Sequence, residues 1–327
     1  MRALICNEYG PPESLEIEVL DEPTPAAGEV LVDVVAAGIN FPDVLAIAGK
    51  YQVKTPTPFV PGNEAAGLVL ALGDGVTRYA VGDKVVFNSK GGAFAERCVA
   101  DQNTVMPLPD GLSFEQGAGF TVTYGTSYHA LRQRANLQAG ETVLVLGAAG
   151  GVGIAAVEIA KALGARVIAA ASSDEKLQFA REAGADELVN YSTQQLKETV
   201  KALTDGNGAD VVYDPVGGEL ADQAFRATAW HGRYLVVGFA SGDIPSFQAN
   251  IALLKEASIM GVWWGTWAAK NPALQIKNMQ ELVALIKEGT VAARVTETYE
   301  LDDFVEAFGA ITERRARGKV ILRIRDS

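Results

Sequence analysis

The segment that most constrains the fold of this chain is residues 143–153, Val-Leu-Val-Leu-Gly-Ala-Ala-Gly-Gly-Val-Gly. Its first four residues are apolar, as in a buried strand, and a helical pattern follows from Val152 to Leu163. A glycine-rich turn between a strand and a helix lets the backbone approach a pyrophosphate, which the helix N-terminus then stabilises. We therefore favour a dinucleotide site over a purely structural turn. Its expected phosphate-binding residues are Gly147, Gly150, Gly151, Val152 and Gly153.

Residues from about 120 onward alternate regularly between apolar and amphipathic segments. Gly164 ends the first helix, and the strand 166–171 follows at once, which completes a βαβ unit. This alternation is typical of a doubly wound, mostly parallel sheet. The expected strands are near residues 143–147, 166–171, 187–190, 209–214, 233–238 and 257–262.

Residues 1–115 have a different pattern, with short apolar runs separated by Gly- and Pro-rich turns, and are expected to be mostly β. A chain of 327 residues exceeds what one core usually supports, so two domains are expected. The tail has helical patterns near 273–287 and 301–315 and a final strand at 319–324. It does not look like a further βα repeat, and we expect it to return to the first domain.

The formal net charge of −12 argues against nucleic acid or an anionic membrane as a partner. No apolar run approaches the length needed to span a bilayer, and nothing resembles a signal peptide. Cys6 and Cys98 are far apart in sequence and are expected to be free thiols, which fits a reducing compartment. The sequence thus predicts a cytoplasmic protein.

The end of the second expected strand indicates which dinucleotide is bound. An NAD site normally has an acidic residue there, whereas this chain has Ser172, Ser173 and, one turn later, Lys176. Hydroxyls and an ammonium suit a 2′-phosphate, so NADP(H) is favoured over NAD(H). The structural alternative is a capping box of Ser172 and Glu175, and both interpretations can hold together.

Six motifs are spread over the chain, at Ala36–Asp43, Pro61–Gly67, Val81–Val85, Thr123–Tyr128, Gly208–Gly218 and residues 317–322. Together they resemble the motifs of the medium-chain dehydrogenase/reductase superfamily, and within it the chain is similar to the zinc-free quinone oxidoreductase (ζ-crystallin-like) family. The resemblance implies an α/β fold in which a Rossmann doubly wound parallel sheet, residues 123–262, is inserted in a GroES-like β-rich catalytic domain, residues 1–122 and 263–327. It also implies a homodimer and NADPH as cofactor. Ser172, Ser173, Lys176, Tyr191 and Arg314 would gather around the 2′-phosphate.

Departures from the superfamily pattern bear on the chemistry. Its zinc alcohol dehydrogenases have a cysteine where this chain has Asn40 and a histidine where it has Asn63. Amides are poor zinc ligands, and Glu64 alone could not hold the metal, so we expect no metal ion. Without a Lewis acid, hydride transfer to a quinone or an activated C=C bond is easier than reduction of a simple ketone.

The resemblance therefore implies NADPH-dependent reduction of quinones, with a planar acceptor as the small-molecule partner. The first alternative is reduction of enones or 2-enoyl thioesters. A further alternative is a protein that binds NADPH without turnover or has a structural role.

Asn40 and Tyr51 are the candidate catalytic residues. The amide of Asn40 could donate to a developing oxyanion or contact the nicotinamide, or it could bond its own loop. Tyr51 matches a family tyrosine near the substrate and could donate a proton, or it could be a packed loop aromatic. For Asp43, helix capping or loop bracing is favoured over acid catalysis.

Four further residues are candidate cofactor contacts. Thr126 matches a family threonine near the nicotinamide carboxamide. Phe239 and Ser241 follow a strand whose carboxyl end should face the ligand crevice. Trp263 belongs to a segment with three of the four tryptophans, which could form an aromatic wall, a subunit contact or a core cluster.

Overall fold

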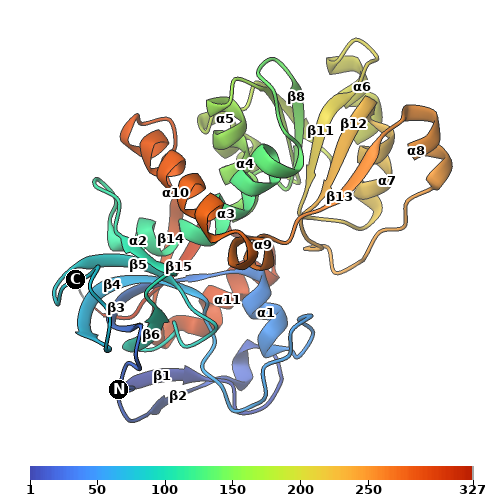
Figure 1. The fold of residues 1–327 in the computed structure, drawn as a ribbon. Coiled ribbons are helices and arrows are strands. Elements are labelled where there is room, and N and C mark those ends of the chain that lie inside the picture. The colour runs from blue at the N-terminus through green and yellow to red at the C-terminus, as the bar shows by residue number, and fades with distance from the viewer. Residues whose placement is uncertain (326–327) are drawn as a thin grey trace. The chain divides into compact units, whose positions relative to one another are not determined.

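The computed structural model describes residues 1–325, which form two compact units (Figure 1). Unit 1 comprises residues 1–122 and the chain from Ala293 onward, and unit 2 is Thr123–Ala292. Within the described residues, no helix has both the length and the apolar character needed to cross a membrane.

Unit 2 is built on a six-stranded sheet of order β10-β9-β8-β11-β12-β13, in which every neighbouring pair is parallel. The first strand in sequence is therefore central, and the strand order reverses between β8 and β11. This confirms the doubly wound sheet predicted from the alternation of patterns. The strands are β8 (Thr142–Leu146), β9 (Arg166–Ala171), β10 (Glu187–Asn190), β11 (Ala209–Asp214), β12 (Thr228–Val236) and β13 (Ser258–Gly261).

The helices around this sheet follow the apolar periodicity of the sequence. The central strands are almost fully buried because helices cover both faces of a parallel sheet. The helices are α3 (Thr121–Tyr128) with the π-helical turn η2 (His129–Arg134), α4 (Gly151–Ala162), α5 (Asp174–Glu182), α6 (Leu196–Leu203), α7 (Glu219–Arg226), α8 (Ala249–Lys255), α9 (Trp264–Lys270) and α10 (Pro272–Lys287).

Unit 1 contains a β-rich sheet of order β14-β15-β3-β4-β5-β7, with β6 pairing β3, and a separate β1-β2 pair. The strands are β1 (Arg2–Ile5), β2 (Glu16–Val19), β3 (Glu29–Ile39), β4 (Glu64–Leu72), β5 (Lys84–Asn88), β6 (Arg97–Asp101), β7 (Val105–Pro107), β14 (Val295–Glu300) and β15 (Lys319–Arg323). The helices are α1 (Phe41–Ile47), α2 (Phe114–Ala118) and α11 (Phe304–Thr312), with 3-10 turns η1 (Pro12–Ser14) and η3 (Leu301–Asp303).

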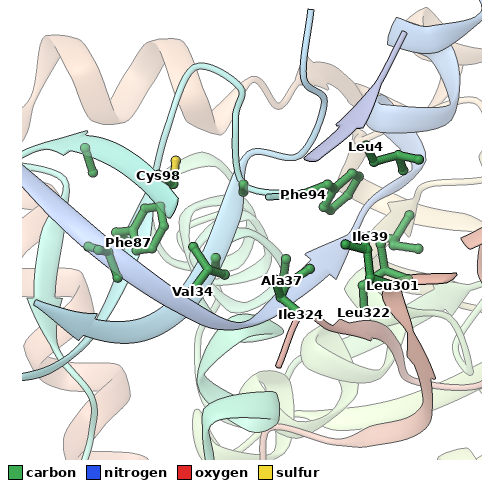
Figure 2. Packing of buried hydrophobic residues seen from close by; sticks show 14 of the residues in the cluster. Leu4, Val34, Ala37, Ile39, Phe87, Phe94, Cys98, Leu301, Leu322 and Ile324 are labelled. Atoms are coloured by element: carbon green, nitrogen blue, oxygen red, sulfur yellow. The ribbon is translucent and has the colours of Figure 1, made fainter. Parts of the chain in front are cut away.

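The chain end returns to the N-terminal sheet because β15 pairs antiparallel with β3, joining Val320 to Ile39. Figure 2 shows the resulting core, in which Leu301 and Leu322 from the tail pack with Leu4 and Ile39. These side chains are at most 2% exposed. The core of unit 1 therefore needs both ends of the chain.

The second boundary between the units differs from the sequence-based one, because residues 263–292 belong to unit 2 rather than to the discontinuous domain. The ring of Trp264 in α9 packs where a Cβ on Gly125 would lie, 2.7 Å from Cζ2. In α10, Asn278 exchanges hydrogen bonds with Gln133, and Glu281 accepts one from the Tyr128 hydroxyl. These contacts with α3 and η2 fasten α9 and α10 to unit 2.

Candidate functional site

The glycine turn of unit 2 follows β8 and leads directly into α4, as predicted. Gly147 has φ of +56°, and a Cβ there would lie 2.9 Å from Cγ2 of Val216. A Cβ on Gly153 would lie 2.2 Å from the carbonyl oxygen of Gly147. Gly150, the N-cap of α4, donates its N–H to the same oxygen at 2.9 Å. The glycines thus allow the turn and the close packing of α4, with the helix N-terminus at the carboxyl edge of the sheet.

Helix α3 is hydrogen-bonded to the first turn of α4. The hydroxyl of Ser127 in α3 donates to the carbonyl oxygen of Val152 at 2.9 Å. Its oxygen also lies 2.9 Å from the hydroxyl of Tyr213 in β11, which is fully buried. Thr126, the candidate carboxamide contact, is half-buried and adjacent to this anchor. Ser127 and Tyr213 therefore fix the helix that carries Thr126 relative to the glycine turn.

Phe239 and Ser241 lie against the loop that follows β11. The backbone N–H of Ser241 donates to the carbonyl oxygen of Val216 at 2.8 Å, and the ring of Phe239 lies 3.1 Å from where a Cβ on Gly217 would be. Because Val216 also packs on Gly147, this loop connects both residues to the glycine turn.

Asp214 holds that loop in place from the end of β11. One carboxylate oxygen accepts the N–H groups of Val216 and Gly217 at 2.7 and 2.9 Å, and the other accepts the Tyr234 hydroxyl at 2.5 Å. Burial raises the pKa of Asp214, and these hydrogen bonds act to lower it. Asp214 is thus a structural carboxylate at the carboxyl edge of the sheet.

Of the predicted 2′-phosphate residues of unit 2, Ser172, Ser173 and Lys176 follow β9, and Tyr191 follows the neighbouring strand β10. Nζ of Lys176 donates to the Ser172 hydroxyl at 3.4 Å, and the backbone N–H of Tyr191 donates to the carbonyl oxygen of Ala171 at 3.1 Å. Ser173, not Ser172, is the N-cap of α5, since its hydroxyl accepts the backbone N–H of Lys176. The Ser172–Glu175 capping interpretation is therefore wrong, and Ser172 keeps its hydroxyl beside the ammonium.

The acidic residues that could oppose a 2′-phosphate do not stand at the end of β9 itself. Asp174 is in the first turn of α5, and its carboxylate accepts a hydrogen bond from Nδ2 of Asn190 at 2.8 Å. Arg314, the fifth residue of the predicted group, belongs to unit 1, where it is exposed with φ of +58° just after α11.

Asn40 and Tyr51 flank α1 in unit 1. Asn40 is the N-cap of α1 and 8% exposed, and Tyr51 lies on the loop after the helix, with its N–H donating to the carbonyl oxygen of Leu45. The Asp43 carboxylate accepts the backbone N–H of Asn40 at 2.8 Å, which is the helix-capping role favoured for it. Burial raises the pKa of Asp43 to about 7.

The amide of Asn40 is held between two buried charges. Its Nδ2 donates to Oε1 of Glu64 at 2.8 Å, and its Oδ1 accepts from Nζ of Lys319 at 2.6 Å. Lys319 and Glu64 are also paired with each other. Within residues 1–325, no group of three His, Cys, Asp or Glu side chains is arranged to hold a metal ion.

The tryptophans of 263–267 have separate roles. Trp264 packs on Gly125, and Trp267 stacks on His129 with centroids 4.2 Å apart. Burial lowers the pKa of His129 to about 4, so its ring is neutral at physiological pH. Trp263 is 57% exposed, whereas Trp264 and Trp267 are half-buried.

Comparison with known proteins agrees with this architecture. The Alcohol dehydrogenase GroES-like domain family matches residues 26–110, and the Zinc-binding dehydrogenase family matches residues 151–288. The chain is 41% identical over 324 residues to a quinone oxidoreductase-like protein 2 homolog from Nematostella vectensis, covering 98% of this chain and 88% of that one. The chain belongs to the quinone oxidoreductase branch of the medium-chain dehydrogenase/reductase family.

Solved structures match almost the whole chain. The quinone oxidoreductase of Escherichia coli complexed with NADPH has a TM-score of 0.93 and 30% identity, covering 99% of this chain and all of that one. The CurK enoyl reductase has a TM-score of 0.90 and 27% identity, covering 99% of each chain. The match confirms the Rossmann sheet inserted in a GroES-like domain.

The sequence did not predict several contacts that hold the candidate site residues in place. Glu64 and Lys319 are separated by 255 positions, so no local pattern could pair them. Asp214 and Tyr213 lie in the Gly208–Gly218 motif. The sequence signal for Asp214 was an aspartate at the end of an apolar strand, directly before a Pro-Val-Gly-Gly turn. Ser127 lies in the Thr123–Tyr128 motif, but its residue type alone did not predict a hydrogen bond to α4.

Proposed function

We propose that this chain is an NADPH-dependent oxidoreductase that reduces quinones without a metal ion. The observation that carries the proposal is the glycine turn of 147–153 at the carboxyl end of β8. There the strand order reverses between β8 and β11, and ligands of such sheets bind beyond the strand ends at this reversal. Whole-length similarity to quinone oxidoreductases supports the same chemistry. When bound, NADPH supplies a hydride to the acceptor.

The preference for NADPH rests on the group after β9. The hydroxyl of Ser172 and the ammonium of Lys176 are donors to a 2′-phosphate, and Ser173 begins a helix whose N-terminus also favours an anion. The carboxylate of Asp174 already accepts a hydrogen bond from Asn190. NADPH should therefore bind more tightly than NADH.

Metal independence is supported by the donor set around Asn40. Residues 40 and 63 are amides, and both nearby carboxylates already have partners, because Glu64 pairs with the ammonium of Lys319 and Asp43 accepts hydrogen bonds from Asn40 and Asn63. A divalent cation bound there would face that ammonium, so the residues do not fit a metal site. Activity should survive dialysis against a chelator, with no stoichiometric metal in the purified protein.

Asn40 and Tyr51 are the residues proposed to act on the acceptor. Hydride addition places negative charge on a quinone oxygen, and an amide N–H of Asn40 can stabilise it. The Tyr51 hydroxyl can donate the proton that completes the hydroquinone. Asn40→Ala should therefore lower kcat with quinones more than it changes NADPH affinity.

The second candidate function is reduction of enones or 2-enoyl thioesters, favoured by similarity to an enoyl reductase. Its acceptor also places charge on a conjugated carbonyl oxygen. A third candidate is NADPH binding without turnover, because the glycine turn accounts for binding alone.

One assay separates these functions. NADPH oxidation is followed with ortho- and para-quinones, enones and enoyl-CoA thioesters, and NADPH binding is titrated separately by fluorescence. Fastest turnover with quinones supports the proposal. Turnover confined to enoyl-CoA overturns the quinone assignment, and tight binding with no turnover favours the non-enzymatic protein. Asn40→Ala is run beside the wild type as the active-site control.

The proposed enzyme is a homodimer located in the cytoplasm. A homodimer is supported by β13, which is an edge strand with Ile259 42% exposed on it, since such an edge can pair with a second copy. A cytoplasmic location is supported by Cys6 and Cys98, which are both buried free thiols.

A further inference from the structure

A buried ion pair crosses one strand of the unit 1 sheet. Glu64 begins β4 and Lys319 begins β15, and both strands flank β3. Glu64 is fully buried and Lys319 is 4% exposed. A Cβ on Gly38 of β3 would lie 2.8 Å from both Oε1 of Glu64 and Cε of Lys319. The missing side chain of Gly38 thus lets the two charges meet across the strand.

The pair holds the amide of Asn40 at both ends. A carboxylate can only accept hydrogen bonds and an ammonium can only donate them. Glu64 therefore requires an N–H from Asn40, and Lys319 requires its carbonyl oxygen, at 2.8 and 2.6 Å. A flipped amide would present its oxygen to the carboxylate and its N–H to the ammonium, so only one orientation is compatible with both charges.

This orientation leaves one N–H of Asn40 for a ligand. Among residues 1–325, the second hydrogen of Nδ2 has only the carbonyl oxygen of Gly38 as acceptor, at 3.5 Å, which is beyond an ordinary hydrogen bond. The other oxygen of Glu64 accepts the hydroxyl of Thr121 and the N–H of Val122, both at 2.9 Å. The carboxylate is saturated and cannot rotate toward this hydrogen.

Stability alone is a weak reason for such a pair. Moving two charges out of water costs about as much as their attraction returns, and apolar replacements of buried pairs are often neutral or stabilising. What a buried pair can provide is a single defined arrangement of the polar groups around it.

We infer that Lys319 is a positioning residue that, with Glu64, fixes the Asn40 amide so that an N–H faces the acceptor oxygen. The inference rests on the proposed function, in which Asn40 donates to that oxygen. Lys319 touches neither cofactor nor acceptor in this scheme and acts through Asn40.

A double-mutant cycle on the full-length protein tests the inference. Lys319→Met keeps the apolar stem and removes the ammonium, and Asn40→Ala removes the amide. Lys319→Met should lower kcat with a para-quinone by roughly tenfold to a hundredfold, somewhat less than outright loss of an oxyanion donor. In the Asn40→Ala background the same substitution should change kcat by no more than about twofold. A purely structural lysine would cost the same factor in both backgrounds.

Three further variants separate a loss of activity from a loss of folding. Lys319→Arg retains a cationic donor and should restore most of kcat. The double variant Glu64→Gln/Lys319→Met leaves no unpaired charge but no longer fixes the amide, so it should fold and remain slow. Lys84→Met, an exposed lysine of the same sheet, is the matched control. Thermal melting and NADPH titration report whether each variant is folded.

The outcomes distinguish the inference from its premise. Unchanged kcat in Asn40→Ala overturns the role of Asn40 and the inference with it. If Asn40→Ala lowers kcat but Lys319→Met lowers kcat by the same factor in the wild-type and Asn40→Ala backgrounds, the positioning role of Lys319 is overturned and the role of Asn40 stands. Full activity of Glu64→Gln/Lys319→Met also overturns it.

Discussion

The side-chain amide of Asn63 donates a hydrogen bond to the buried carboxylate of Asp43, with 2.8 Å between Nδ2 and Oδ1. Asp43 is completely buried, and burial raises its pKa to about 7. The charge of Glu64 raises this pKa further, whereas the Asn40 N–H, the Lys319 ammonium and the Asn63 amide lower it. Its protonation therefore changes within the physiological pH range, unlike that of an ordinary aspartate.

This shift predicts a pH-dependent stability. Between about pH 4 and 7 the folded protein keeps a proton on Asp43 that the unfolded chain has lost. The free energy of unfolding should therefore fall as pH rises through this window, by about 1.4 kcal/mol per pH unit from this group, and level off above it. Asp43→Asn removes the contribution, so the stability of wild type relative to this variant should decrease with rising pH. Urea unfolding at several pH values measures it.

Asp74→Asn, in an exposed turn of the same unit, is the control and should show no such trend. If the stability difference between wild type and Asp43→Asn is the same at every pH, Asp43 does not titrate in this window.

A second prediction concerns cofactor choice. Replacing Lys176 by glutamate puts a carboxylate beside Ser172, where the 2′-phosphate of NADPH is proposed to bind. Lys176→Glu should weaken NADPH binding by about 10- to 100-fold, the value of one charge-assisted hydrogen bond, and leave NADH within about twofold. Fluorescence titration of both nucleotides measures this. Lys197→Glu, on an exposed face of α6, should change neither affinity; equal losses for NADPH and NADH in Lys176→Glu would contradict the phosphate role.

The sequence was sufficient for the parallel sheet of unit 2 because the signals of its strands and helices are local. The central strands contain the apolar runs 143–146 and 167–171, helical segments separate the strands, and Gly164 follows the end of α4. The strand Arg166–Ala171 was predicted with the bounds that the structure has.

Other features depend on contacts between distant residues and were not predictable. The boundary placed at residue 263 lies near 293 because Trp264 packs on Gly125 and Glu281 accepts from Tyr128, and neither contact has a periodic signature. For Asn40, residue type alone suggested a donor to an oxyanion. That its amide is held between Glu64 and Lys319 required the pairing of β4, β3 and β15.

The glycine turn yields a third prediction, in which two neighbouring glycines differ. A Cβ on Gly153 would lie 2.2 Å from the carbonyl oxygen of Gly147, so Gly153→Ala must push α4 from the sheet and should cost about 1–3 kcal/mol of stability. A Cβ on Gly150 would lie 3.4 Å from that oxygen, and its φ of −76° suits alanine. Gly150→Ala should keep nearly the wild-type melting temperature and instead weaken NADPH binding, because its methyl group obstructs the pyrophosphate.

Thermal melting and NADPH titration on the same two variants separate these effects. A Gly150→Ala protein that binds NADPH like wild type would show that the pyrophosphate does not approach this position.

The last prediction concerns the edge strand β13. Its outer edge can pair with β13 of a second copy, and Ile259 is 42% exposed there. Ile259→Lys places a charge on the proposed contact, which disfavours edge-to-edge pairing. Sedimentation should find a wild-type dimer and an Ile259→Lys protein shifted toward monomer. Ile276→Lys, at a similarly exposed isoleucine on α10, should leave the dimer intact. A monomeric wild type, or a dimer that resists Ile259→Lys, would rule out assembly through β13.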